Sequence, residues 1–255
     1  MIFYLMNNKS NNSNKSNMSN EQVEKPKRTR VVQPPLQKYL NEDPNILEIG
    51  VDEVGRGPLF GRVYTAAVIL PKDDSFDHSL MKDSKKFHSQ KKIEETAEYI
   101  KQHAISWCVS YEDEKVIDTI NILQATQQSM HKSILQIRKQ RPLNELEQYH
   151  LLIDGNYFNP ITTVNKQKNK LETINYTCVE GGDNKYTVIA AASILAKVAR
   201  DKYIEELCLD HPELSAHYCI DSNKGYGAKK HLDGIKEHGI TIWHRRSFGI
   251  CKNYN

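Results

Sequence analysis

The sequence predicts an α/β fold in which helices flank a mixed sheet and a helical extension follows at the C-terminus. Three features indicate this. Apolar runs of strand length recur at residues 47–51, 63–70 and 151–153. Apolar residues at helical spacing lie between them. The resulting order is three strands, helix, strand, strand and helix, with one more helix between the second and third strands. Such alternation is typical of helices packed on the faces of one sheet.

The first three strands differ in how they pattern apolar residues. Residues 47–51 (LEIGV) alternate, which predicts a strand that ends at Asp52. Residues 63–70 (VYTAAVIL) are almost continuously apolar, as in a central strand buried on both faces. Residues 104–111 (AISWCVSY) are the third predicted strand.

The helices follow from a period near 3.6. Ile93, Ala97 and Ile100 have spacings of four and three, so a helix precedes the third strand. Residues 113–139 keep one apolar face, which predicts a long helix that ends before Pro142.

The C-terminal half repeats the alternation. Residues 151–153 form a short strand that ends at Asp154, and residues 173–179 form another strand. Residues 185–208 are predicted to be helical, and a last helix covers residues 228–238.

The N-terminal part has a different composition. Residues 7–20 contain only Asn, Ser, Lys and Met, which predicts disorder, so we divide the chain into a tail (1–45) and a folded domain (46–255). The net charge is +3, and residues 1–46 hold seven basic and four acidic side chains. The remainder is neutral, so net charge alone does not indicate a nucleic-acid partner. Residues 25–30 (KPKRTR) suit a nuclear-import signal and equally a solvated basic stretch.

Cysteine usage and hydropathy bear on location. The five cysteines include no C-x-x-C pair, which indicates reduced thiols in an intracellular, cytoplasmic protein without a zinc site or disulfides. No window approaches the roughly 20 apolar residues of a membrane span. The apolar start at residues 1–6 is too short for a signal peptide.

Four acidic residues lie where a strand or loop ends beside glycine: Asp52, Glu53, Asp154 and Asp183. Carboxylates that converge repel one another unless a cation neutralises them, and hard oxygen ligands suit Mg²⁺ or Mn²⁺. Two such ions about 4 Å apart support phosphodiester hydrolysis. Taken singly, each acid also suits a turn or a helix cap. Neighbours on a regular strand point to opposite faces, so Asp52 and Glu53 share a site only if the strand ends or bulges there.

The motifs around these acids form an ordered set. Residues 50–61 read GVDEVGRGPLFG; DSKK (83–86), NILQAT (121–126), LLIDGN (151–156), GGDNKYTVIAAASILAKVARD (181–201), NKGYGAKKH (223–231) and HRRSF (244–248) follow. In this order the set resembles ribonuclease HII, the type 2 ribonuclease H. The resemblance runs from about residue 46 to 248, some four-fifths of the chain.

The resemblance implies a ribonuclease H-like fold and makes residues 46–255 the catalytic domain. Asp52, Glu53, Asp154 and Asp183 match the family's catalytic, metal-binding carboxylates, with two ions, Mg²⁺ or Mn²⁺, per site. The implied substrates are RNA–DNA hybrids, cut in the RNA strand, and duplex DNA cut 5′ of an embedded ribonucleotide. The products would carry 3′-hydroxyl and 5′-phosphate ends. We expect a monomer.

The resemblance also implies substrate contacts. The main chain of Gly55, Arg56 and Gly57 would meet the 2′-hydroxyl, which distinguishes RNA from DNA. Tyr226 would stack on the sugar and bond the same hydroxyl.

Basic residues recur around the motifs, and we expect phosphate contacts from Lys85, Lys86 and Lys197. Arg200, Arg245 and Arg246 belong to the same basic set. We expect His231 and His244 to serve in packing, and Asp201 to be a helix residue or a partner of Arg200.

Arg56 and Asp183 favour ribonuclease HII over ribonuclease HIII, which usually lacks the arginine and has Glu as its fourth acid. Arg62 departs from the family pattern, where proline is typical, and puts the local strand geometry in doubt. Two other functions stay open: a related nuclease such as a DNA-structure resolvase, and an inactive hybrid-binding protein.

Overall fold

The computed structural model describes residues 34–165 and 170–254. By its contacts the chain divides into Met1–Pro34 and Pro35–Asn255, and the second unit is described below. The predicted disorder of residues 7–20 and the import signal at residues 25–30 lie outside the described residues.

A five-stranded mixed sheet forms the centre of this unit, in the order β3-β2-β1-β4-β7. The central strand β1 pairs antiparallel with β2 and parallel with β4. The predicted mixed sheet is therefore confirmed. Its strands are β1 (Ile46–Val54), β2 (Val63–Ile69), β3 (Ser106–Glu112), β4 (Gln148–Asp154) and β7 (Asn175–Val179).

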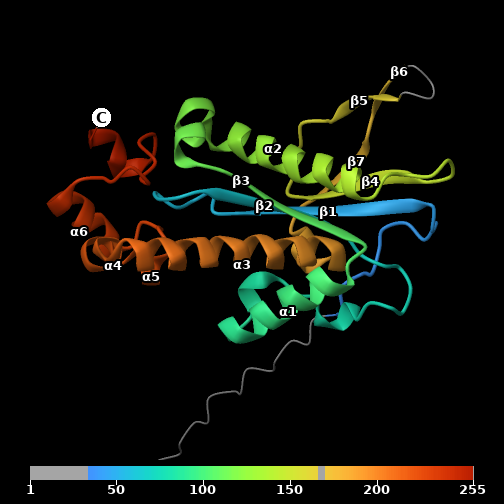
Figure 1. The fold of residues 1–255 in the computed structure, drawn as a ribbon, viewed down its shortest axis with the longest axis horizontal. Helices are drawn as coiled ribbons and strands as arrows, with labels where there is room; N and C mark the ends of the chain where they lie inside the picture. The colour runs from blue at the N-terminus through green and yellow to red at the C-terminus, as the bar shows by residue number, and fades with distance from the viewer. Residues whose placement is uncertain (1–33, 166–169, 255) are drawn as a thin grey trace, which may run out of the picture. The chain divides into compact units, whose positions relative to one another are not determined.

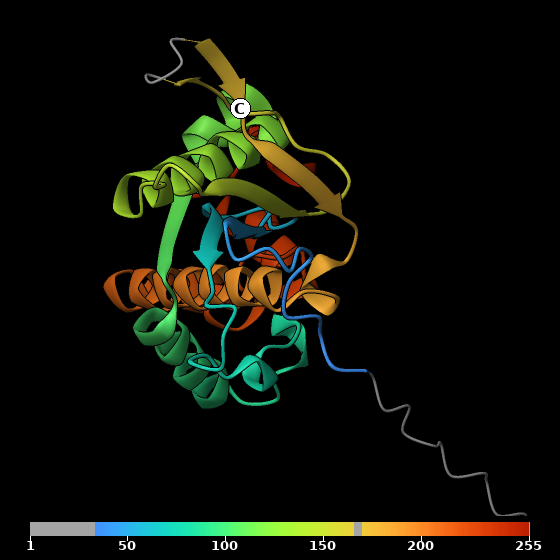
Figure 2. The ribbon, with the colours of Figure 1, turned by 90° about the vertical axis from the view of Figure 1, so that its right-hand side faces the viewer.

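Helices cover both faces of the sheet (Figures 1 and 2). The helix α2 (Glu114–Gln140) lies on one face, and α3 (Thr187–Asp210) lies on the other with α1 (Gln90–His103) beyond it. Because strand side chains alternate, odd-numbered β1 residues pack towards α2, while Ala66 and Val68 of β2 pack on α3. All of β2 is buried, as its apolar run predicted.

The main chains of α3 and β1 come close together at Gly50. A Cβ atom built there would lie 2.4 Å from the carbonyl carbon and oxygen of Val188, a distance that no side chain can occupy. The small residues 190–192 of α3 are fully buried in the same layer. Glycine and alanine therefore let α3 lie directly on the strand that ends in the predicted carboxylates.

The C-terminal extension is helical, as predicted. It comprises α4 (Pro212–Tyr218), α5 (Ile220–Asn223) and α6 (Lys229–His238), and it packs around Phe60 and Ile235. Only α6 was expected from the sequence. Among the described helices, none has the length and apolar character needed to cross a bilayer. All five cysteines are free thiols.

Three elements differ from expectation. β1 continues to Val54 in regular pairing with β2, whereas the sequence predicted a strand that ends at Asp52. Asn121 interrupts α2 with a φ of 66°, and its side-chain oxygen accepts a hydrogen bond from Gln124 N, as a cap does. The expected strand at residues 173–179 is divided between two strands. Its first residue, Thr173, ends β6 (Lys170–Thr173), which pairs with β5 (Thr162–Asn165), and β7 begins at Asn175.

Residues 35–45, which we assigned to the tail, lie within the second unit and contact the rest of it. Gln37 N donates to the Lys185 carbonyl, and the Gln37 carbonyl accepts from Thr187 N. Leu40 N and Asn41 N donate to the carboxylate of Glu48, which is buried. The contacts thus begin before the expected boundary between residues 45 and 46.

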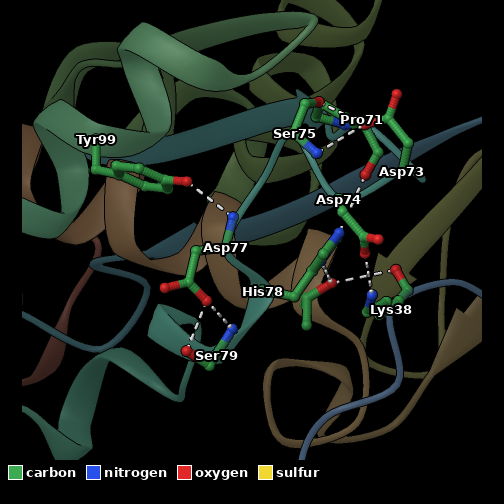
Figure 3. A network of polar contacts seen from close by, with 10 residues as sticks. Lys38, Pro71, Asp73, Asp74, Ser75, Asp77, His78, Ser79 and Tyr99 are labelled. Carbon is green, nitrogen blue, oxygen red and sulfur yellow. Dashed lines mark hydrogen bonds and ion pairs between the residues drawn. The ribbon is translucent and has the colours of Figure 1, made fainter.

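A polar network fixes the connection between β2 and α1 (Figure 3). His78 Nδ1 lies 2.9 Å from Thr187 Oγ1, and the Thr187 hydroxyl donates to the Lys38 carbonyl. Asp77 N donates to the Tyr99 hydroxyl at 2.8 Å. The network joins this connection to the start of α3 and to the segment before β1.

Candidate active site

Asp52 and Asp154 lie at the same edge of the sheet. Asp154 ends β4, and Asp52 lies in β1 directly after the parallel pairing of the two strands, which runs as far as Val51 and Ile153. Asp52 is buried and bonded to Ser193 of α3. Asp154 Oδ1 accepts a hydrogen bond from Gly182 N at 2.6 Å. The strand ends therefore bring these two predicted ligands together.

Asp183 joins them from the turn before α3. It is the middle residue of η3 (Gly182–Asn184), a short 3-10 helix, and it is buried. Asn184 Nδ2 donates to Asp183 Oδ1 at 2.9 Å and to Asp83 Oδ2 at 3.3 Å. Asp83 is thus a fifth carboxylate close to the site.

Glu53 approaches from the other face of β1. It pairs with Thr65, whose hydroxyl contacts Ser129 of α2, and the pairing stays regular through Val54. The strand does not bulge at this point. The Glu53 carboxylate forms an ion pair of 3.3 Å with Arg56, so its place in a shared metal site stays a prediction.

The electrostatics of the four acids favour a bound cation. Burial, followed by repulsion from Glu53 and Asp154, raises the pKa of Asp52 well above its usual value. Burial, with repulsion from Asp83 and Asp154, raises the pKa of Asp183. Burial also raises the pKa of Glu53, although Arg56 opposes the shift. A divalent ion would relieve both the repulsion and the desolvation.

The donor set fits Mg²⁺ or Mn²⁺. Each of Glu53, Asp154 and Asp183 uses one carboxylate oxygen in a hydrogen bond within the protein, and within residues 34–165 and 170–254 the other oxygen has no hydrogen bond. In the same residues, no three His, Cys, Asp or Glu side chains are arranged as a ready-made metal cluster. The acids therefore suit a metal by chemistry and charge, while their side chains are not preassembled.

The structure also brings together the predicted 2′-hydroxyl contacts. A Cβ atom at Gly57 would lie 3.5 Å from Cε1 of Tyr226, whose side chain is 49% exposed. Gly55 has a φ of +91°, and a Cβ there would lie 2.4 Å from Nε of Arg200. Only glycine allows this close approach.

The three predicted phosphate contacts differ in their surroundings. Lys85 lies close enough to Glu53 and Asp183 to act against the rise in their pKa. Lys86 Nζ bonds Asn184 Oδ1. Lys197 is paired with Asp201, which we had considered a partner of Arg200. Contact of these lysines with phosphate stays a prediction.

Two of the basic residues near the motifs are not available for phosphate. Arg200 is 1% exposed and Arg245 is 0% exposed. Both bind main-chain carbonyls inside the protein. The sequence pattern could not distinguish these internal cations from surface ones.

The histidines have the packing role that we expected. His244 Nδ1 accepts from Thr241 N, so the neutral ring carries its proton on Nε2 and donates to His231 Nε2 at 3.1 Å. His231 Nδ1 then donates to the Tyr226 carbonyl. Both rings are buried around Phe60.

Arg62 does not distort the sheet. Its guanidinium lies 4.1 Å from the ring centre of Tyr111 and 4.3 Å from that of Tyr203. The next residue, Val63, begins β2 in regular pairing with β3.

Sequence reasoning missed several residues that hold the acids. Ser193 bonds Asp52, and Ser84 Oγ lies 3.0 Å from Ser193 Oγ. Asn184 bridges Asp183 and Asp83. These four supporting residues, Asp83, Ser84, Asn184 and Ser193, lie in the same motifs as the acids or in DSKK. Membership of these motifs is the sequence feature from which they could have been predicted.

The site is separate from two hollows in the surface. Two hollows of about 550 and 390 Å³ lie elsewhere, one along β3 and the end of α1, the other at the start of β1. No predicted site residue lines either of them.

Comparison with known proteins decides the family. The family model described as Ribonuclease HII matches residues 49–251. The chain belongs to the ribonuclease HII family. A Ribonuclease HII of Bacteroides thetaiotaomicron is 43% identical over 215 residues, which cover 84% of this chain and 94% of that protein. The chain is accordingly a metal-dependent ribonuclease, a hydrolase.

Solved structures share the fold. The ribonuclease H2 of Pyrococcus horikoshii OT3 has a TM-score of 0.59 at 22% identity, over 81% of this chain and 96% of that chain. Bst-RNase HIII in complex with Mn²⁺ has a TM-score of 0.53 at 17% identity, over 76% of this chain and 70% of that chain. The ribonuclease H-like fold is therefore confirmed for this member of the ribonuclease HII family.

Proposed function

We propose that this ribonuclease cuts the RNA strand of RNA–DNA hybrids and incises duplex DNA 5′ of an embedded ribonucleotide. One observation supports this above the others. Asp52 in β1, Asp154 at the end of β4 and Asp183 in the turn before α3 lie near one another, and β1 leads directly into Gly55-Arg56-Gly57 beside Tyr226. A hydrolytic centre thus adjoins a surface suited to a ribose.

The carboxylates would hold two divalent ions, Mg²⁺ or Mn²⁺, which supply an activated water and neutralise charge on the phosphate. Asp52, Asp154 and Asp183 come from three separate segments, and Glu53 completes the set from the other side of β1. Ser193 and Asn184 orient two of these acids through hydrogen bonds. Hydrolysis would leave 3′-hydroxyl and 5′-phosphate ends.

Recognition of the substrate would rest on the ribose and the backbone. Tyr226 is half exposed beside Gly57, so its ring is accessible to a sugar. Main-chain groups of residues 55–57 would bond the 2′-hydroxyl, which DNA lacks. Lys85, Lys86 and Lys197 would contact phosphates without reading sequence.

The test is an incision assay on a labelled DNA duplex with one ribonucleotide, in Mg²⁺ or in Mn²⁺. We expect wild-type protein to cut on the 5′ side of the ribonucleotide. Asp154→Asn keeps an oxygen for Gly182 N but loses the charge, so activity should fall about a hundredfold or more. Asp210→Asn, at the exposed end of α3, is the matched control and should cut like wild type.

The other outcomes separate the competing functions. Equal cutting of an all-DNA duplex would favour a DNA-structure resolvase. Absence of incision in both metals, with retained hybrid binding, would favour a hybrid-binding protein. Either result would overturn the proposed function.

A further inference from the structure

The loop between β1 and β2 (residues 55–62) is held from inside by one guanidinium group. Arg245 donates from Nε, Nη1 and Nη2 at 2.6–3.0 Å. The acceptors are four main-chain carbonyls, those of Gly55, Arg56, Pro58 and Gly61. The side chain is fully buried, and these four carbonyls are its hydrogen-bond acceptors among the described residues; the carboxylates of Glu114 and Asp118 act on it without forming an ion pair.

A charge in this position is costly. Within the part of the chain that the structure describes, Arg245 forms no ion pair, and burial, together with the nearby Arg200, lowers its pKa to about 9. It is still protonated at neutral pH. A buried charge without a counter-ion persists only where hydrogen bonds satisfy it. The directed donors of the guanidinium are therefore what this position requires.

Those donors fix which way the loop's peptide groups point. In a trans peptide the C=O and the next N–H point in opposite directions. Because the carbonyls of Gly55 and Arg56 turn inward to Arg245, the N–H groups of Arg56 and Gly57 turn outward. Neither N–H has an acceptor among residues 34–165 and 170–254.

The peptide between Pro58 and Leu59 also has its carbonyl turned towards Arg245 and its N–H turned away, and here the N–H has an acceptor within the protein. The Pro58 carbonyl accepts from Arg245, and Leu59 N donates the other way to the Gly225 carbonyl at 2.9 Å. Gly225 directly precedes Tyr226. The inward carbonyls thus set outward donors along the loop, and the outward side is the side of Tyr226.

Arg200 joins the same two segments. Its Nη2 donates to the Lys224 carbonyl at 2.9 Å and, more weakly, to the Phe60 carbonyl at 3.5 Å. The loop of residues 55–62 and the segment that bears Tyr226 are therefore fixed to each other through buried arginines.

We propose that Arg245 is a positioning residue for ribonucleotide recognition, which holds the N–H groups of Arg56 and Gly57 towards the 2′-hydroxyl of the substrate. This rests on the proposed function and adds to it a residue that does not touch the substrate. Arg245 acts only through the main chain of the loop, and its contribution is to selectivity for ribose over deoxyribose.

The test compares two affinities for each variant, all in an Asp154→Asn background with Mg²⁺ so that the duplex stays intact. One duplex contains a single ribonucleotide, and the other is DNA of the same sequence. We compare Arg245→Met and Arg245→Lys with Arg138→Met, a matched control at the far end of α2. Because both affinities come from one preparation, an unfolded fraction cancels in their ratio.

We expect Arg245→Met to reduce the ribonucleotide preference about tenfold, the loss of one or two hydrogen bonds. Binding to all-DNA duplex should change less than twofold. Arg245→Lys keeps the charge but cannot span four carbonyls, so its preference should also fall, and it provides the test if Arg245→Met does not fold.

An unchanged preference in the Arg245 variants, or an equal loss of both affinities, would overturn the inference. If wild-type protein does not incise the ribonucleotide duplex and the background shows no preference, the proposed function itself fails. Incision by wild type with an unchanged preference in the variants rejects only the role of Arg245.

Discussion

Asp52 shows at the scale of a single residue how a catalytic group opposes stability. It is buried, and burial together with two neighbouring carboxylates raises its pKa. A carboxyl group whose pKa is higher in the folded state than in the unfolded state destabilises the fold once pH exceeds the unfolded value. At neutral pH without metal, the ionised Asp52 is therefore unfavourable.

Asp52→Asn should abolish incision and yet increase the free energy of unfolding in EDTA by about 1 kcal/mol. The amide keeps an oxygen for Glu53 N, which donates to Asp52 in the wild type. Addition of Mg²⁺ should stabilise wild type more than the variant, as urea unfolding in both conditions would show. A variant less stable than wild type in EDTA would contradict this account.

His244 makes stability depend on pH. Burial, followed by repulsion from His231, lowers its pKa from 6.5 to about 3. Below pH 6.5 His244 is protonated in the unfolded chain but stays neutral in the folded protein. The free energy of unfolding therefore falls as pH falls from 6.5 towards 3. This contribution is fully present above pH 6.5.

At about pH 5 the loss from this group should be about 2 kcal/mol relative to neutral pH. Urea unfolding at both pH values should show a smaller loss for His244→Asn. His88→Asn, which changes an exposed histidine, should behave like wild type. If the unfolding free energy depends on pH equally in all three proteins, the pKa of His244 is not lowered in the folded state.

At the scale of elements, the contact of α3 with β1 positions the strand that bears Asp52. Gly50→Ala would place a methyl group 2.4 Å from the main chain of Val188, which cannot rotate away. We expect a loss of about 3 kcal/mol in unfolding free energy. At Gly227 a Cβ atom would make only ordinary contacts, 3.7 Å from Leu59 and 3.9 Å from Leu232, so Gly227→Ala should change stability by less than about 0.5 kcal/mol. Similar values for the two variants would refute this view of the contact.

The segment before β1 gives a second test at this scale. Deletion of residues 1–34 should leave the unfolding free energy unchanged. Deletion of residues 1–45 removes Leu40 N and Asn41 N from the buried Glu48 carboxylate, which should cost about 2 kcal/mol. Thermal and urea unfolding of both proteins would check this, and equal stability would place the folding boundary at residue 46 as first expected.

The sequence predicted most elements because their apolar period is strong. Residues 63–70 and 185–208 are nearly the elements β2 and α3. The break in α2 at Asn121 could not be predicted from the apolar pattern, because the apolar face of the helix continues on both sides of this residue. The hairpin of β5 and β6 was also missed, because its exposed Val164 and Leu171 do not alternate against a core.

At the scale of the whole molecule, the zero net charge of the folded part is the sum of acidic and basic groups that lie in different places. Acidic residues gather at one sheet edge, and Lys85 lies near them. The sequence correctly placed Asp154 at a strand end and Asp183 after a glycine turn, whereas Asp52 and Glu53 lie inside β1; their role as metal ligands stays a prediction. The internal positions of Arg200 and Arg245 could not be predicted, because burial of a cation depends on carbonyls from segments far apart in the chain.

Arg200 and Arg245 form their hydrogen bonds with main-chain carbonyls of the loop at residues 55–62. These bonds do not depend on which side chains the loop carries. Arg200 binds the carbonyl of Arg62, which every amino acid possesses. The side chain at that position is left to find its own place, here between two tyrosine rings. The fold thus accommodates an arginine at position 62, and outward side chains other than its glycines can change while the arginines keep the loop in the same shape.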